Sequence, residues 1–130
     1  MGVHVVAGIL RDRDGRVLLA ERLNDREFAG YWEFPGGKVD PGEAREAALI
    51  RELAEELGIE IVRFEYFLSL EHDYADRQVH IEFFLVTEWQ REARGMLGQG
   101  LKWLPVDEIP GVRLLPANET VVEKLQRLSG

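Results

Sequence analysis

Long apolar runs and alternating patterns predict most of the strands in this chain. They fall at residues 3–10, 16–22, 59–70 and 78–89, with shorter extended stretches at 32–34 and 101–104. The turn signal Asp14-Gly15 joins the first two runs as a hairpin. The two long runs predict an antiparallel pair, connected by residues 71–77.

Helical periodicity replaces the strand pattern in two places. Residues 43–57 form the long helical pattern, and Gly58 is well placed to end it. Residues 118–128 are amphipathic and predict a closing helix. Pro35-Gly36-Gly37 is expected to break the extended stretch that precedes the first helix. Loops are expected at residues 24–30 and 91–100.

These elements predict a mixed α/β fold, with a sheet between two helices, in a single domain of residues 1–130. No apolar run approaches the roughly 20 residues that a membrane span needs. The start, Met1-Gly2-Val3-His4-Val5, lacks the basic and apolar segments of a signal peptide. We therefore expect a cytoplasmic protein without a membrane partner, either a monomer or a homodimer.

Composition narrows the classes of partner. The formal net charge is −8, from 24 acidic and 16 basic residues. This argues against binding a nucleic acid polymer, because that requires a basic surface. A small polyphosphate can still bind an acidic site where divalent cations separate the two sets of negative charge. No cysteine is present, so disulfides and thiolate metal sites are excluded.

The first helical pattern concentrates negative charge on one face. Glu52, Glu55 and Glu56 lie within about 100° of one another on a helical wheel, opposite an apolar arc. Their repulsion costs a few tenths of a kcal/mol per pair, and the helix dipole disfavours anions near the C-terminus. Bound Mg²⁺ or Mn²⁺ would turn this repulsion into attraction. The alternative is a solvated acidic face without a ligand.

The segment that carries this face has a recognisable spacing. Gly37 is followed after five residues by Glu43, and after seven more by the run Arg51-Glu52-Leu53-Ala54-Glu55-Glu56-Leu57-Gly58-Ile59. This resembles the Nudix box in full. Residues 32–38 and 115–119 are similar to the MutT-type branch of that family, whose members hydrolyse oxidised guanine nucleoside triphosphates.

The resemblance implies a Nudix α/β/α sandwich with a mixed β-sheet between helices. It implies that Mg²⁺, with Mn²⁺ as a substitute, is held by Glu52, Glu55, Glu56 and the Gly37 carbonyl. Glu52 would also act as the base for the attacking water. Arg51 and Glu43 would form a supporting ion pair that orients the helix and the loop before it.

The resemblance also implies a nucleotide pocket. Asn118 would read the guanine edge, since an amide offers both a donor and an acceptor; the alternative is a helix N-cap. Phe34 would stack on the base or fill the core. Arg22 and Arg77 would contact the nucleotide, or be ordinary surface arginines. Tyr74 is a further candidate for stacking.

One position departs from the MutT-type pattern. Such enzymes carry another glutamate in the loop before the last short strand, where this chain has Leu97. No acid occurs between Glu92 and Asp107. The identity of the base and the number of metal ions therefore stay open, and an acid from a different loop is one alternative.

Three functions follow from these residues. The first is hydrolysis of 8-oxo-dGTP to the monophosphate and pyrophosphate, which sanitises the nucleotide pool. The second is the same chemistry on CTP, dCTP or another nucleotide, and the third is a non-catalytic nucleotide-binding module. The family's ADP-ribose hydrolases usually carry a proline some way after the box, and none occurs between Pro41 and Pro105. The histidines His4, His72 and His80 show no metal-ligand spacing and are interpreted as ordinary strand residues.

Overall fold

The computed structural model describes residues 2–23 and 27–129. The predicted loop at 24–30 falls partly on residues 24–26, which lie outside the described residues. The strands are β1 (Gly2–Leu10), β2 (Arg16–Glu21), β3 (Trp32–Glu33), β4 (Gly36–Lys38), β5 (Glu60–Tyr74), β6 (Arg77–Gln90) and β7 (Leu101–Pro105). The helices are α1 (Arg45–Leu57) and α2 (Glu119–Ser129), with short 3₁₀ turns η1 (Val106–Gly111) and η2 (Pro116–Asn118).

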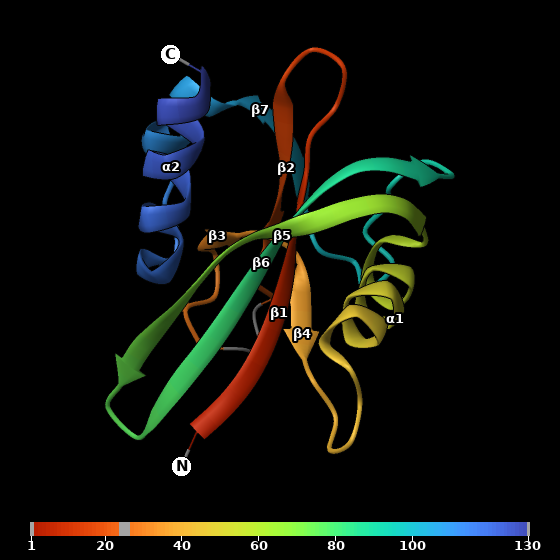
Figure 1. The fold of residues 1–130 in the computed structure, drawn as a ribbon. Coiled ribbons are helices and arrows are strands. Elements are labelled where there is room, and N and C mark those ends of the chain that lie inside the picture. Colours follow the sequence, from red (N-terminus) through yellow and green to blue (C-terminus); the bar gives the residue numbers. More distant parts are fainter. Residues whose placement is uncertain (1, 24–26, 130) are drawn as a thin grey trace.

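The strands form two sheets. The larger has the order β4-β1-β6-β5, in which β1 runs parallel to β6 and the other neighbours are antiparallel. The smaller is antiparallel, with the order β3-β2-β7. Helices α1 and α2 lie on opposite sides of the strands (Figure 1). The expected α/β/α sandwich with a mixed sheet is thus confirmed.

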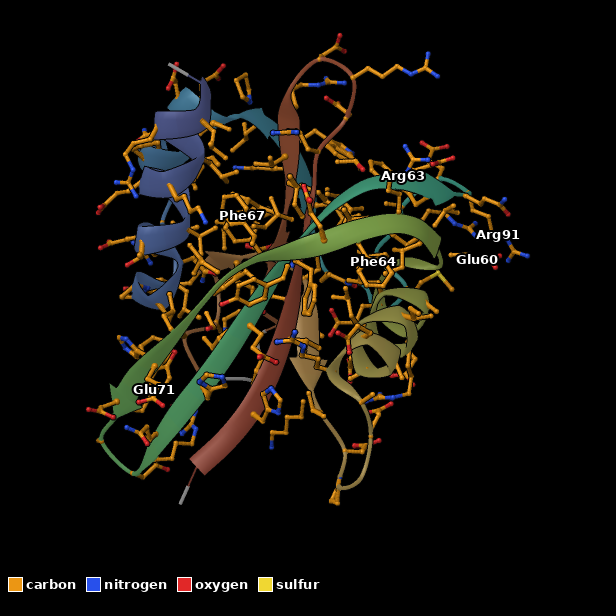
Figure 2. All side chains as sticks on the ribbon, in the orientation of Figure 1. Glu60, Arg63, Phe64, Phe67, Glu71 and Arg91 are labelled. Carbon is orange, nitrogen blue, oxygen red and sulfur yellow. The ribbon has the colours of Figure 1, made fainter. Side chains whose placement is uncertain are left out.

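The two helices bury different faces of the same strands. Successive side chains of a strand point to opposite faces, so Val6 and Leu10 of β1 pack with α1 while Ala7 and Ile9 pack in the α2 cluster. In strand β5, Phe64 points toward α1 and Phe67 toward α2 (Figure 2). Among the described residues, no helix is both long and apolar enough to cross a bilayer.

The predicted break after the extended stretch at 32–34 is confirmed, since β3 ends at Glu33 and the next strand belongs to the other sheet, but the two glycines lie in that next strand. They begin β4, which pairs with β1 so that Gly37 lies opposite Val6 and Gly36 opposite Ala7. A Cβ at Gly36 would overlap the backbone of β1. Glycine is therefore required here for a close approach of two backbones, although its local preference is for turns.

The predicted connection at 71–77 is mostly wrong. Strand β5 continues to Tyr74 and β6 begins at Arg77, which leaves a two-residue turn. Residues 71–77 are mostly polar, and this end of the hairpin is partly exposed. Glu71 nevertheless pairs with His80 across the two strands. Cross-strand pairing with β6 extends β5 to Tyr74, and such pairing depends on context more than on the local residues.

Both helices begin later than predicted. Ala44 is the N-cap of α1, so Glu43 lies in the preceding turn. Asn118 ends a 3₁₀ turn, and α2 begins at the next residue. The expected stop at Gly58 is confirmed, since its backbone is left-handed with φ 69° and its N–H donates to the Ala54 carbonyl.

Replacing Gly58 by alanine tests this stop. A side chain in the left-handed region costs about 1 kcal/mol, and the added Cβ would also lie close to Met96 Sδ. We expect Gly58→Ala to lower the free energy of unfolding by about that amount, measured by urea denaturation. Gly111→Ala is the control, because its Cβ would meet nothing within 4 Å. An equal loss in both variants would contradict the prediction.

Candidate active site

A cleft of about 360 Å³ gathers residues from distant parts of the chain. It extends over the α2-facing side of β1 and β6 and past the edge strand β4. Seven of the predicted site residues line it: Arg22, Phe34, Gly37, Glu52, Glu56, Tyr74 and Arg77. The lining also includes Phe28, Glu33 and Lys38, which the sequence did not single out.

Helix α1 supplies the acidic end of the cleft. Its apolar side, including Leu49 and Leu53, is fully buried against the sheet, which turns the glutamates toward β4. A Cβ at Gly37 would overlap the carboxylate of Glu52. The Gly36 N–H donates to Glu56 Oε2 at 3.3 Å. The glutamates can therefore reach the cleft because β4 presents no side chain at these two positions.

Arg51 links the helix to the turn before it. Its Nε and Nη2 both donate to the carboxylate of Glu43 at 2.9 Å, a bidentate pair. Its Nη2 also donates to the Lys38 carbonyl at 3.1 Å. Its Nη1 lies 2.9 Å from Glu52 Oε1 and 3.5 Å from Glu55. One guanidinium therefore contacts three of the four box glutamates.

The electrostatics of Glu43 and Glu52 differ. Hydrogen bonds from Arg51 and from the Asp40 N–H lower the pKa of Glu43 to about 2. Burial raises the pKa of Glu52, although Arg51 opposes the shift and Glu55 adds to it. Glu43 is thus held as a carboxylate, while Glu52 is a more basic one.

The donor set suits a hard divalent cation. Glu52 and Glu56 line the cleft, whereas Glu55 is not part of its lining and has a side chain that is 58% exposed. All three offer carboxylate oxygens, which Mg²⁺ and Mn²⁺ prefer. The ligand atoms of these three glutamates do not all lie within 4.8 Å of one another. Within the described part of the chain, two histidine nitrogens and a carboxylate oxygen do so at His4, His80 and Glu82.

The cleft lining also contains two arginines and aromatic rings, and both arginines are ion-paired with acids. Arg22 donates from Nη1 to Glu33 at 2.8 Å and from Nε to the Glu27 carbonyl at 2.6 Å. Arg77 lies over the Tyr74 ring at 4.8 Å, and Phe28 packs beside that ring at 5.8 Å. The structure thus brings these two arginines and Tyr74 together in the lining of one cleft.

Phe34 and Asn118 are more buried than a ligand-reading role suggests. Phe34 is 3% exposed and packs edge-on against Phe83, although it contributes to the cleft wall. Asn118 is 4% exposed and is not part of the cleft lining. Its side-chain Nδ2 donates to the Leu115 carbonyl at 3.3 Å. This bond goes back to the residue before η2, whereas an N-cap side chain would accept a hydrogen bond from the first turn of α2.

Leu97 lies where the comparison with MutT-type sequences expects an acid. It is exposed and lines a small pocket beside Glu56. Glu21 of β2 and Glu33 of β3 line the same pocket. Acids from the smaller sheet therefore approach this end of α1. No sequence signal marked them, since a strand glutamate is ordinary until the two sheets are placed together.

Three of the cleft residues were missed for different reasons. Glu33 lies in a short extended stretch without a motif, and Lys38 follows the glycine pair. Phe28 lies in a predicted loop and has a left-handed backbone, with φ 59°. Such a conformation is uncommon for a bulky side chain, and it places Phe28 against both Tyr31 and Tyr74.

Comparison with known proteins agrees with this site. Residues 2–126 match the NUDIX domain. The chain is 37% identical to the 8-oxo-dGTP diphosphatase of Escherichia coli (strain K12), over 97% of this chain and 98% of that protein. It is 38% identical to the CTP pyrophosphohydrolase of the same organism, over 97% and 93% of the two chains. The crystal structure of a MutT NUDIX hydrolase from Burkholderia pseudomallei superposes with a TM-score of 0.86, at 31% identity over 95% and 97% of the chains.

The chain therefore belongs to the NUDIX family, as its box indicated. It is a nucleotide hydrolase of that family. Nudix hydrolases generally use divalent metal ions, which agrees with the acidic end of the cleft.

The pKa of Glu43 predicts how stability depends on pH. Because the pKa falls from 4.5 to about 2 on folding, the stabilisation is complete above the unfolded value and is lost as the pH falls toward 2. We expect Glu43→Gln to be less stable than wild type near neutral pH. The difference should shrink steadily below about pH 5, as measured by denaturant unfolding at a series of pH values.

The matched control is Glu65→Gln, on the exposed side of β5. It should show no comparable pH-dependent difference. A gap between Glu43→Gln and wild type that stays constant from neutral pH into acid would show that the Arg51 ion pair is not its source.

Proposed function

We propose that this chain uses Mg²⁺ to hydrolyse a purine nucleoside triphosphate, with 8-oxo-dGTP as the preferred substrate, to the monophosphate and pyrophosphate. The observation that carries this proposal is one cleft whose lining combines the glutamates of α1 with arginines and aromatic rings. Such a lining matches a ligand that combines a polyphosphate with a base. The names of several relatives, including the Escherichia coli 8-oxo-dGTP diphosphatase, support the same substrate. In this role the protein would act as one domain in the cytoplasm.

Glu52, Glu55, Glu56 and the Gly37 carbonyl are the residues we assign to the metal. When bound, Mg²⁺ would neutralise charge on phosphate oxygens and lower the pKa of a water ligand. Arg51 already contacts Glu52 Oε1, so the second oxygen of that carboxylate is the one we assign to the cleft. Mn²⁺ has the same preference for oxygen ligands and is the expected substitute.

Glu52 is the proposed general base. Its raised pKa makes it a better proton acceptor than an exposed carboxylate. It would take a proton from the attacking water, whose oxygen forms a bond to phosphorus as the bond to the leaving phosphate oxygen breaks. Arg51, held by Glu43, would keep the Glu52 carboxylate oriented. MutT-type sequences carry a further glutamate where this chain has Leu97. Glu33 and Glu21, which line the same pocket as Leu97 and Glu56, are the acids we propose as alternatives for its role.

The remaining cleft residues are assigned to substrate binding. Arg22, Arg77 and Lys38 would neutralise phosphate charge, which a protein of net charge −8 must do locally. The rings of Tyr74 and Phe28 would stack on the base. Asn118 would read the purine edge only if its amide turns from Leu115 toward the cleft.

A second candidate is pyrophosphohydrolysis of CTP. It keeps the same metal chemistry and is supported by the 38% identical CTP pyrophosphohydrolase. The specific observation in its favour is that Asn118 is bonded to Leu115 and does not line the cleft. In that case the purine-reading role of Asn118 is absent, and the arginines and aromatic rings carry the selectivity.

Replacing Glu52 tests the chemical step. We expect Glu52→Gln to reduce kcat at least ~100-fold, the usual scale for general acid–base catalysis, with the fold retained by circular dichroism. Glu46→Gln is the matched control, because Glu46 lies in the first turn of the same helix and pairs with Arg45. Unchanged turnover in Glu52→Gln would remove this residue from the mechanism.

A nucleotide panel tests the substrate. We expect 8-oxo-dGTP to have a higher kcat/KM than dGTP, dCTP, CTP or ADP-ribose with Mg²⁺, and to yield 8-oxo-dGMP and pyrophosphate. Asn118→Ala should then reduce the preference for 8-oxo-dGTP over CTP by ~10-fold, the scale of one base-reading hydrogen bond. If CTP is the best substrate and Asn118→Ala leaves the ranking unchanged, the second candidate is correct.

A further inference from the structure

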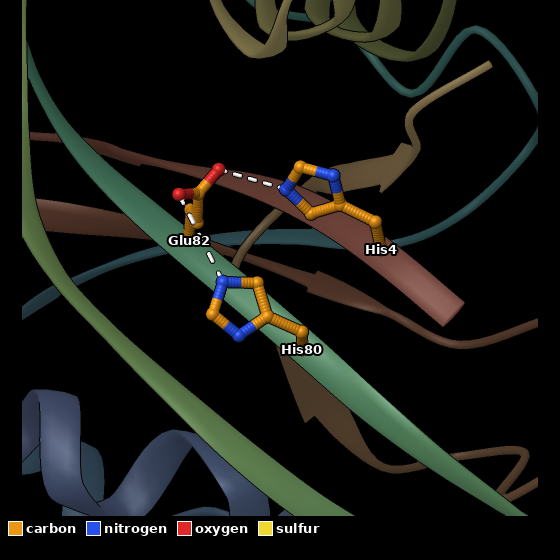
Figure 3. Close-up of side chains that lie close together, drawn as sticks. All are labelled: His4, His80 and Glu82. Atoms are coloured by element: carbon orange, nitrogen blue, oxygen red, sulfur yellow. Dashed lines mark hydrogen bonds and ion pairs between the residues drawn. The ribbon is translucent and has the colours of Figure 1, made fainter. Parts of the chain in front are cut away.

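Two histidines and a glutamate meet on the face of the large sheet that turns away from the cleft. His4 of β1 lies directly opposite His80 of the parallel strand β6. Glu82 follows two residues after His80 and so shares its face. One ligand atom from each of the three lies within 4.8 Å of the others. Figure 3 shows both rings directed toward the Glu82 carboxylate.

We propose that His4, His80 and Glu82 form a binding site for a transition-metal ion of the Zn²⁺ class. His4 Nε2 lies 2.8 Å from Glu82 Oε2, and His80 Nε2 lies 3.9 Å from Glu82 Oε1. Two imidazole nitrogens and a carboxylate oxygen are ligands that Zn²⁺, Co²⁺ and Ni²⁺ accept well, whereas Mg²⁺ prefers oxygen alone. A three-residue set leaves a further coordination position for water.

The groups around these ligands are those that metal sites use to orient their ligands. His80 Nδ1 faces Glu71 Oε1 at 3.7 Å, so a proton on Nδ1 would leave the Nε2 lone pair directed at the site. Arg45 Nη1 donates to Glu82 Oε1 at 2.7 Å, which fixes the carboxylate and leaves Oε2 toward His4. The Glu82 carboxylate is thus held by Arg45, and Glu71 lies near His80 without a hydrogen bond to it.

Charge and burial are compatible with a bound cation. The side chain of Glu82 is 11% exposed, and its carboxylate accepts a hydrogen bond from Arg45. The positive charge of Arg45 acts against a second cation, while Glu71 and the net charge of −8 act in its favour. The side chains of His4 and His80 are 42% and 43% exposed, so an ion can enter from solvent.

This site is separate from the acidic end of the cleft. The cleft is floored by odd-numbered residues of the same strands, such as Val5 and Ile81, which point to the opposite face. The sequence interpretation of His4 and His80 as strand residues is correct. Their separation in the chain concealed the arrangement, because only the parallel register of β1 and β6 makes them neighbours.

The experiment is a Zn²⁺ titration of the full chain in excess Mg²⁺, which keeps the oxygen-only ligands of α1 occupied. We expect one equivalent of Zn²⁺ to shift the imidazole NMR signals of His4 and His80 while leaving His72 unchanged. His4→Gln and His80→Gln should each weaken Zn²⁺ binding at least ~10-fold by calorimetry, as expected for the loss of a ligand.

The matched control is His72→Gln, in β5, whose ring packs against Tyr74 instead. It should bind Zn²⁺ as wild type does. The proposal is overturned if no equivalent binds, if His4→Gln and His80→Gln keep wild-type affinity, or if His72→Gln weakens binding equally. Circular dichroism of each variant verifies that it is folded, and the readout does not depend on nucleotide hydrolysis.

Discussion

The contact between the glycines of β4 and their neighbours is the constraint on which the site depends. Gly36 lies against the backbone of β1, and Gly37 lies against the carboxylate of Glu52. Helix α1 packs on one face of the sheet, whereas the cleft opens mainly on the other. The glutamates cross from one side to the other at this edge strand. A side chain at either glycine would separate β4 from β1 or from the helix.

Charge at the acidic end of the cleft is organised by Arg51. Four glutamates in one short segment would repel one another, and the guanidinium contacts Glu43, Glu52 and Glu55 at once. The same group has a different effect on each of its partners. Glu43 is locked as a carboxylate by a bidentate pair, while burial keeps the pKa of Glu52 above its ordinary value despite Arg51. A structural carboxylate and a reactive one are thus produced by burial and geometry from identical side chains.

The two faces of β1 and β6 carry different kinds of side chain. Where α1 and α2 cover them, alternation buries apolar side chains on both sides. Past the N-terminal end of α1, the face of the sheet that this helix covers becomes polar. His4, His80 and Glu82 lie on that face beside Arg45, the first residue of the helix. The opposite face of the same segment forms the floor of the cleft. One pair of parallel strands therefore supports two chemically different surfaces.

Local geometry explains what the sequence determined by itself: the long helix with its acidic face, its stop at Gly58, the main strands and the family. These follow from helix and strand periods and from the spacing of Gly37, Glu43 and Glu52. Tertiary structure decided the rest. The glycines of β4 became a strand, and Glu33 and Phe28 joined Arg22, Tyr74 and Arg77, because of which strands pair and how the two sheets meet. His4 and His80 became neighbours through a parallel register, and such long-range pairing has no local signal in the chain.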